Sequence, residues 1–331
     1  MKLATLLTLV LTIALSSCSS KKKEAELLEL TRPEWLKNRP VSSAYFYGIG
    51  TTPKVGNALY YEEKAKERAL SDLAKQISTK IKSEQSMYRM EDNKGVYEYI
   101  QSRVKATSNE FLEGYQYMDK WEDLNNYYAY YRLSKSEFYA RKAQRKEEAL
   151  QLSLLKLKQA HDAAEKHEVA IALEQFAAAI DAISGYLNEE TSITTEQGKL
   201  DLFEESKEGI SSLVSQLSLS YDKPAITTST TSKIANGITT LSVNCNSFAA
   251  SNIPIRFNYS GGFLVSDKFK SSSKGEILSP EFTFGTKAEE TLKASIDLKS
   301  LGRQITRNLI VRQLIEKQKP ATAVLTVQQA N

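Results

Sequence analysis

Histidine and cysteine are the side chains best suited to acid–base, nucleophilic or metal-binding chemistry near neutral pH, and this 331-residue chain has two of each. His161 and His167 both fall near the turn of a predicted helical hairpin, with no cysteine or carboxylate cluster nearby. A zinc site needs several such ligands, and a catalytic nucleophile needs a positioned base. We therefore predict no catalytic residue, no metal site and no cofactor, and a protein that is not an enzyme.

Two further features with possible chemistry have simpler explanations. Gly48-Ile49-Gly50 lacks the third glycine of a dinucleotide-binding loop, and the end of a strand explains it better. Cys245 is expected to pack as a small apolar side chain in a β domain.

The most function-like feature is a concentration of aromatic side chains on two strands predicted over residues 111–121 and 127–133. Because alternate residues of a strand share a face, we expect one aromatic face on each strand. These faces hold Phe111, Tyr115, Tyr117 and Trp121 on the first strand, and Tyr128 and Tyr130 on the second. Cross-strand aromatic pairs stabilise a hairpin by about 0.2–1 kcal/mol each, and tyrosine also stacks on glycans and proteins. Two interpretations remain open, hairpin packing and a ligand face formed by Tyr115, Tyr117, Trp121, Tyr128 and Tyr130.

The N-terminus has the pattern of a secretory leader. Lys2 gives a positive start, and residues 3–15 are almost purely apolar. At about 1.5 Å per residue, this run is too short to cross a hydrocarbon core about 30 Å thick, which indicates a signal sequence. No later stretch of about 18 residues is as apolar, so we expect no second membrane crossing.

The residues that end the leader, Leu15-Ser16-Ser17-Cys18, resemble the lipobox of bacterial lipoproteins. The resemblance implies a signal peptide over residues 1–17, cleavage after Ser17, and a diacylglycerol anchor with palmitate-type chains on Cys18. Two or more acyl chains hold a protein stably on a membrane. An ordinary secretory signal with a chance cysteine is the alternative.

Residues 18–29 are predicted to form a solvated tether. Ser19 stands where aspartate retains some Gram-negative lipoproteins at the inner membrane, and so resembles an outer-membrane address. Lys21-Lys22-Lys23 is opposite in charge to the acidic stretch that serves as a surface-export signal in some bacterial groups. We therefore expect a lipid-anchored protein of the bacterial outer membrane that faces the periplasm.

Residues 30–137 mix aromatic strands with helices in the order β-α-β-α-β-β. A strand over 44–52 precedes a helix over 58–81, whose alanine-rich face suits close packing on a sheet. A strand ending at Met90, a second helix over 96–108 and the aromatic hairpin complete the order. The pattern predicts an α+β domain with its helices on one face of a sheet.

Short motifs in this domain resemble the lipoprotein-20 family of small bacterial envelope lipoproteins. They are Pro33-Glu34-Trp35, Tyr47-Gly48-Ile49-Gly50 and the helix with Ala65, Ala69 and Leu73-Ala74. The family's domain is similar to the N-terminal module of a flagellar ring-assembly protein. The resemblance implies an envelope lipoprotein without known enzymatic activity. Because residues 138–331 follow the shared domain in this chain, a function carried over concerns one domain only.

Residues 138–219 are helical in pattern almost throughout, with helices predicted over 138–164, 168–187 and 196–217. The first two form a helical hairpin, and the second resembles a tetratricopeptide-repeat helix. No second copy follows at a period of about 34 residues, which disfavours a solenoid. A helical spacer or small bundle and a peptide-binding groove remain the two interpretations.

Residues 220–331 are rich in Thr, Ser, Val, Ile and Gly, and apolar residues alternate with polar ones in short runs. Turn signals every 8–12 residues or so predict a β-sandwich. The run over 254–298 resembles a bacterial immunoglobulin-like domain, a scaffold that hosts many functions. Residues 300–317 do not fit this pattern and predict a short inserted helix.

The charge balance, 44 basic against 40 acidic residues, is too even for a nucleic-acid-binding surface. We expect a non-enzymatic, lipid-anchored envelope lipoprotein that acts as a structural or binding module for an envelope protein or glycan. The alternative is an accessory regulator or assembly factor of a larger envelope machine, such as a cell-wall synthase, a secretion complex or a flagellar ring.

Overall fold

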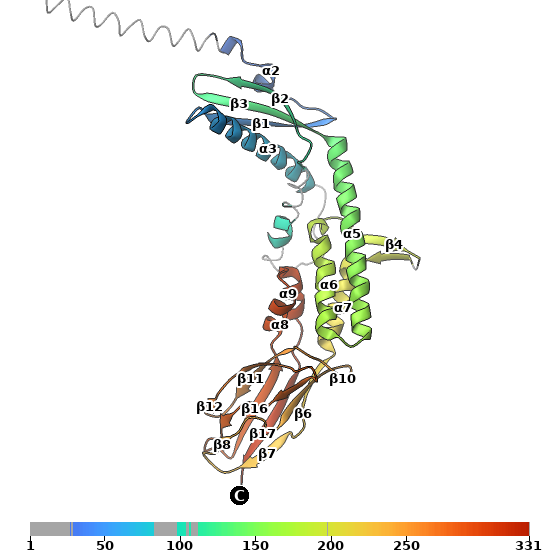
Figure 1. Cartoon of the computed structure of the whole chain (residues 1–331), viewed down its shortest axis with the longest axis vertical. Helices are drawn as coiled ribbons and strands as arrows, with labels where there is room; N and C mark the ends of the chain where they lie inside the picture. Colours follow the sequence, from blue (N-terminus) through green and yellow to red (C-terminus); the bar gives the residue numbers. More distant parts are fainter. Residues whose placement is uncertain are drawn as a thin grey trace, which may run out of the picture. The chain divides into compact units, whose positions relative to one another are not determined.

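The chain forms two compact units. Unit 1 is the described part of Met1–Ser86 and Lys105–Arg145, and unit 2 is the described part of Met87–Val104 and Lys146–Asn331. Both combine helices with sheets, so the predicted mixed α+β class is confirmed. The computed structural model (Figure 1) describes residues 27, 29–82, 98–103, 106, 112–196 and 198–330.

Some predicted features lie outside the described residues. They are the signal peptide with its cleavage site after Ser17, the lipidated Cys18, most of the tether, the strand ending at Met90, and Phe111. These stay predictions from the sequence.

Unit 1 is built on an antiparallel sheet in the order β1-β3-β2, formed by β1 (Tyr45–Pro53), β2 (Gln116–Glu122) and β3 (Asn126–Ser134). Helix α3 (Ala58–Lys82) crosses one face of this sheet (Figure 1). Alternate residues of β1 and β3 are buried, as expected for strands with one covered face. The short helix α2 (Glu34–Lys37) precedes β1.

Helix α3 packs closely on β1 because two glycines and two alanines meet there. A Cβ added to Gly48 would lie 2.3 Å from the carbonyl oxygen of Ala69, and one added to Gly50 would lie 1.8 Å from that of Ala65. Both alanines are fully buried, so the predicted alanine-rich packing face is confirmed. The two glycines lie inside β1 and not at its end, and close helix–strand approach is the reason for them.

Polar side chains cover the outer edge of β1. The Asp72 carboxylate accepts a hydrogen bond from the Ile49 N–H at 3.0 Å. Gln76 and Arg39 donate to the Tyr47 carbonyl oxygen at 2.6 and 3.0 Å. Backbone groups at this edge are therefore satisfied within unit 1, which leaves less for another strand to pair with.

Residues 98–103 are helical, as predicted, but they belong to unit 2. Ile100 is buried there, and the Arg103 Nε donates to the Ser184 hydroxyl at 3.0 Å. The prediction that this helix covers the sheet of unit 1 is wrong. Its apolar face can be buried against other helices as well as against a sheet, and the local pattern does not distinguish the two.

The helices of unit 2 include the part of α5 (Lys135–Glu165) from Lys146 onward, α6 (Val169–Ile183) and α7 (Leu202–Ser215). Among the described residues, one segment passes for a membrane span by length and composition: Val169–Tyr186, which is α6 with the 3₁₀ turn after it. Of this segment, 56% is buried inside the unit, where α6 packs on α7. That burial is typical of a core helix.

A hairpin separates α6 from α7. Strands β4 (Ser192–Thr195) and β5 (Gly198–Asp201) form an antiparallel pair, and α7 begins directly after them. The Asp201 carboxylate accepts hydrogen bonds from two N–H groups in the first turn of α7, so it acts as the N-cap. The helix predicted over 196–217 is therefore wrong at its start.

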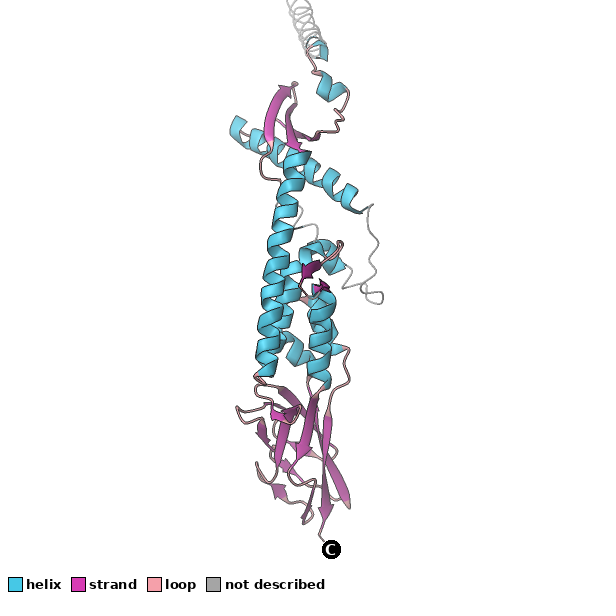
Figure 2. Ribbon diagram, turned by 90° about the vertical axis from the view of Figure 1, so that its right-hand side faces the viewer, coloured by secondary structure: helices cyan, strands magenta, loops and turns pink. Residues whose placement is uncertain are grey.

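The C-terminal part of unit 2 consists of short strands in several sheets (Figure 2). In one sheet β9 pairs with β6, β10 and β14. A second sheet has the order β13-β11-β16-β17-β7, and a third has the order β12-β15-β8. The bounds are β6 Leu217–Tyr221, β7 Ala225–Thr228, β8 Lys233–Ile234, β9 Thr240–Cys245, β10 Phe248–Ala249, β11 Pro254–Tyr259, β12 Phe263–Leu264, β13 Lys268–Lys270, β14 Glu276–Leu278, β15 Phe282–Thr283, β16 Glu289–Ile296 and β17 Thr322–Gln329. Alternate residues of β9 and β16 are buried, including Cys245, as predicted for that thiol.

Two helices, α8 (Leu298–Ile305) and α9 (Leu309–Glu316), lie between β16 and β17, where the sequence predicts one helix over 300–317. Each has its own N-cap side chain, which explains the division. They pack on α6 and α7, and Asn308 Nδ2 donates to the Asp181 carboxylate at 3.0 Å. Contacts therefore join the helical and the β parts of unit 2.

Candidate functional site

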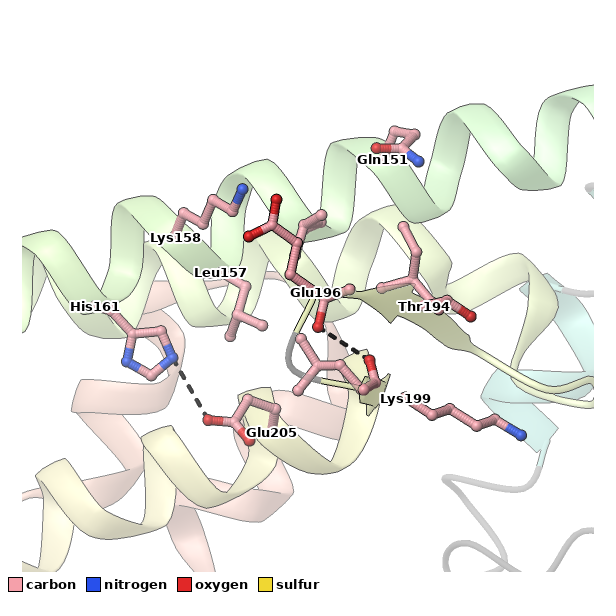
Figure 3. Close-up of a pocket in the computed structure, with 13 residues that line it drawn as sticks. Gln151, Leu157, Lys158, His161, Thr194, Glu196, Lys199 and Glu205 are labelled. Atoms are coloured by element: carbon pink, nitrogen blue, oxygen red, sulfur yellow. Dashed lines mark hydrogen bonds and ion pairs between the residues drawn. The ribbon is translucent and has the colours of Figure 1, made fainter.

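A groove of about 860 Å³ lies between α5, the β4–β5 hairpin and the start of α7, all within unit 2 (Figure 3). Its volume falls in the range of about 300–1,000 Å³ that is common for ligand sites. The lining side chains come from three elements. They are Gln151, Leu154, Leu157, Lys158 and His161 of α5, Ile193 to Glu196 and Gly198 to Leu200 of the hairpin, and Glu205 of α7.

The floor of the groove is apolar. Leu157 is buried at 2% exposure, and Leu154 is half-buried beside it on α5. On the hairpin, Ile193 and Leu200 are paired opposite each other and therefore share one face. An apolar strip thus runs from the helix to the hairpin, while polar side chains surround it.

The charged side chains of the groove differ in whether they have partners. His161 Nε2 lies 3.6 Å from the Glu205 carboxylate, and Lys199 pairs with Glu190. Lys158 on α5 has no ion-pair partner among the described residues. Glu196, at the turn of the hairpin, is likewise without one in that part of the chain. Each of the two walls therefore carries one charged side chain that forms no ion pair within the described residues, Lys158 on α5 and Glu196 on the hairpin (Figure 3).

The histidines have structural surroundings. The His161 ring contacts Phe176 edge-on at 5.3 Å, in addition to its Glu205 neighbour. His167 has φ 62° in the turn after α5 and stacks on Phe248 with a centroid distance of 3.4 Å. The prediction of His167 as a turn residue is confirmed. Within the described residues, no group of three or more His, Cys, Asp or Glu side chains is arranged to hold a metal ion.

The sequence predicts a helix that includes residues 196–201, whereas the structure has the hairpin wall of the groove there. Two signals were present. Leu154 and His161 are each three and four residues away from both Leu157 and Lys158, so the four side chains share one side of α5. The run Ser192–Thr195 is β-branched except for its first residue, which favours a strand.

The aromatic hairpin forms as β2 and β3, but its two faces differ from the prediction. The pairing register shifts between Tyr117 and Asp119, so Tyr117 lies opposite Tyr131, whereas Trp121 lies opposite Tyr128. One extra residue in a strand moves every later side chain to the other face. The prediction that Tyr115, Tyr117 and Trp121 share a face is therefore wrong.

Tyr115 and Tyr117 lie on the side of the sheet that carries α3. Both contact the buried Tyr131 edge-on, at centroid distances of 5.6 and 5.5 Å. Lys66 of α3 lies 5.4 Å from the centre of the Tyr115 ring, and a hydrogen bond to Tyr115 raises the pKa of this lysine. These two tyrosines pack at the border between helix and sheet.

Trp121 and Tyr128 lie together on the opposite face, with a centroid distance of 5.3 Å. The Tyr128 hydroxyl donates to Asp123 in the loop between β2 and β3, at 3.2 Å. Burial raises the pKa of Asp123, but the N–H groups of Asn125 and Asn126 more than offset this, so the pKa lies below its ordinary value. The loop thereby fixes the position of the half-buried aromatic pair.

Tyr130 also lies on this second face, but Trp35 of α2 covers it. The two rings stack at 4.9 Å with an interplanar angle of 12°, and Trp35 Nε1 donates to the Asp119 carboxylate at 2.9 Å. Tyr130 is 8% exposed, and burial raises the pKa of its hydroxyl. Of the five residues of the predicted ligand face, Tyr117 is 55% exposed on the side of the sheet that carries α3, and Trp121 and Tyr128 lie side by side and partly accessible on the other face.

No family model matches this chain, and none of the curated proteins or solved structures matches it. The lipoprotein-20 resemblance therefore stays a prediction from the residues that carry it.

Proposed function

We propose that this chain is a non-enzymatic, lipid-anchored lipoprotein of the bacterial envelope that acts as a structural or binding module. The observation that carries the proposal is Leu15-Ser16-Ser17-Cys18 at the end of a short apolar leader. In this proposal diacylglycerol on Cys18 anchors the protein, Ser19 favours the outer membrane, and the lysines after it favour the periplasmic face.

Two surfaces support the binding role. The groove of unit 2 combines an apolar floor with charged walls, and the Trp121–Tyr128 pair offers aromatic surface on unit 1. The consecutive strands β6 and β7 enter different sheets, which supports the proposed immunoglobulin-like sandwich as the scaffold below the groove. An envelope protein or a glycan is the proposed partner class.

In mechanism, the anchor would act by raising local concentration. A binding site tethered to a membrane meets partners in the same membrane or wall layer at an effective concentration far above that of a free protein. Loss of the anchor should therefore reduce partner engagement in the cell while the intrinsic affinity of the groove stays unchanged.

The test is metabolic labelling with a palmitate analogue, followed by membrane fractionation, in cells that produce the full-length protein. Cys18→Ala should lose both the label and the membrane association. Cys245→Ala is the matched control, because it removes the other cysteine, which is buried in unit 2. A Cys18→Ala protein that remains labelled and membrane-bound would overturn the proposal.

The flagellar-module resemblance of residues 30–137 favours a second candidate, an accessory regulator or assembly factor of an envelope machine. Such a role predicts a stoichiometric complex that survives native electrophoresis after mild crosslinking. A binding module without this role would give transient crosslinks to abundant envelope components.

A further inference from the structure

The β4–β5 hairpin has strand edges with no partner strand. Among the described residues, the two strands pair only with each other. A two-stranded sheet exposes N–H and C=O groups along both outer edges, and a further strand can pair with them. Four residues per strand would be marginal alone, but the Asp201 cap and the Leu202 N–H, which donates to the Thr191 carbonyl at 3.1 Å, hold the hairpin on α7.

The dimensions of the groove fit an extended chain. The α5 wall runs from Gln151 to His161, which is about 15 Å at 1.5 Å per residue. A strand rises about 3.3 Å per residue, so about five residues of extended peptide would cover this length. Strand addition to a sheet edge, with side chains in neighbouring pockets, is a recurrent mode of peptide recognition.

The charges favour an acidic residue in that peptide. Among the groove's basic side chains, His161 and Lys199 already have carboxylate neighbours, whereas Lys158 has no ion-pair partner in the described residues. An acidic side chain of the ligand would form an ion pair with Lys158. Glu196 on the hairpin turn would repel a second acidic residue placed there.

We propose that this groove binds an extended segment of a partner protein, which adds as a strand to the edge of the β4–β5 hairpin. One apolar side chain of the segment packs on Leu154, Leu157 and Ile193, and one acidic side chain meets Lys158. The proposal rests on the proposed function as a binding module and names its partner class. The many charged side chains around the apolar floor make the groove less suited to a lipid acyl chain.

The test is selection of peptides from a random heptapeptide library on the full-length protein in mild detergent. We expect a consensus with one acidic and one apolar residue at a fixed spacing. Lys158→Glu should weaken the selected peptide by about tenfold or more, because the ion pair becomes a repulsion. Leu154→Gln should weaken it by about tenfold through the lost apolar contact.

Matched controls lie on α5 and directly after its end. Leu155→Gln changes the neighbouring leucine, which is 51% exposed and outside the groove, and Lys166→Glu makes the same charge change just beyond the end of α5. Both should bind the peptide as the parent does. Thermal unfolding of all four variants near the parent temperature shows that a loss of binding is not a loss of folding.

Amide hydrogen exchange gives the second readout. A bound strand should slow the exchange of backbone amides within Ser192–Asp201, since the edge groups acquire partners. Three results would each overturn the proposal: unchanged exchange in this hairpin, a failure to select any peptide, or a selected peptide that binds Lys158→Glu and Leu154→Gln as tightly as it binds the parent. The labelling of Cys18 is measured separately, so the anchor and the groove can fail independently.

Discussion

Strand β1, at one edge of the unit 1 sheet, and the hairpin of unit 2 treat their strand edges in opposite ways. At β1, Asp72, Gln76 and Arg39 occupy the edge groups of Tyr47 and Ile49. At β4 and β5 the described residues provide no third strand. Native proteins normally blunt exposed edges, so an edge left open beside a groove indicates a place where something else can pair.

The faces of the two regions also differ. In unit 1, Trp35 covers Tyr130, whereas Tyr117 is 55% exposed and Trp121 and Tyr128 are partly accessible. In unit 2 the space between α5 and the hairpin is open, although its floor is apolar. The groove that we propose as a binding surface is therefore built from an apolar floor and charged walls, whereas the ligand face predicted from the sequence consists of aromatic side chains.

The largest effect is expected at the close contact between β1 and α3 in unit 1. Gly50→Ala places a Cβ 1.8 Å from the Ala65 carbonyl oxygen, and the backbone cannot yield without moving α3. We expect at least about 3 kcal/mol loss in the free energy of unfolding of unit 1, measured by urea denaturation. Gly262→Ala, in unit 2, is the control for a Cβ added without contacts, because it meets nothing within 4 Å, and it should leave the unfolding of both units unchanged. Equal stability of the two variants would contradict close packing as the reason for Gly50.

The next largest effect is expected where the Trp35 ring packs over Tyr130. Trp35→Ala removes a stacked ring and the hydrogen bond to Asp119, and should cost about 2 kcal/mol of unfolding free energy. Trp35→Phe retains an aromatic ring and should lose about half as much. Trp121→Ala is the comparison on the same face. It should cost less than Trp35→Ala, because the Trp121 side chain makes no hydrogen bond within the described residues and its partner Tyr128 is less buried than Tyr130. A larger loss for Trp121→Ala would show that the outer pair, and not the cover, stabilises this face.

A smaller effect is expected at the outer edge of β1. Asp72→Ala leaves the Ile49 N–H without its acceptor and should cost about 1–2 kcal/mol, whereas Asp72→Asn keeps an acceptor and should cost less. Hydrogen exchange at Ile49 should accelerate in the alanine variant, toward the fast exchange expected at the open edges of β4 and β5. Exchange at Ile49 that is unaffected by Asp72→Ala would remove the contrast between the two edges.

The elements of unit 1 that depend on local pattern could be predicted from the sequence. The alanine spacing of α3 and the alternation of β1 and β3 both follow from which side chains must be buried. The change of face within β2 could not be predicted, because a bulge is fixed by pairing with β3 and not by the period of β2 itself. The cover by Trp35 depends on Asp119, 84 residues away in the chain.

In unit 2 the errors have a different cause. The strands β4 and β5 are only four residues long, and Glu196, Lys199 and Leu200 are compatible with a helix, so the pattern over 196–217 read as one element. The N-caps Asp201 and Asn308 set where α7 and α9 begin, and both are visible in the sequence. The N-cap Asp201 thus marks the boundary between the hairpin, which forms one wall of the groove, and α7.

The smallest effect is expected at the loop that joins β2 and β3 in unit 1. Because the pKa of Asp123 lies below its ordinary value, folding favours the ionised carboxylate. This contribution to stability is present above the unfolded-state pKa and is lost as pH falls through the lower folded-state pKa. Urea denaturation between about pH 2 and pH 6 should therefore show a smaller acid-induced loss for Asp123→Asn, which does not titrate, than for the parent. Identical pH profiles would mean that the contribution of the Asp123 hydrogen bonds to stability does not depend on the charge of its carboxylate.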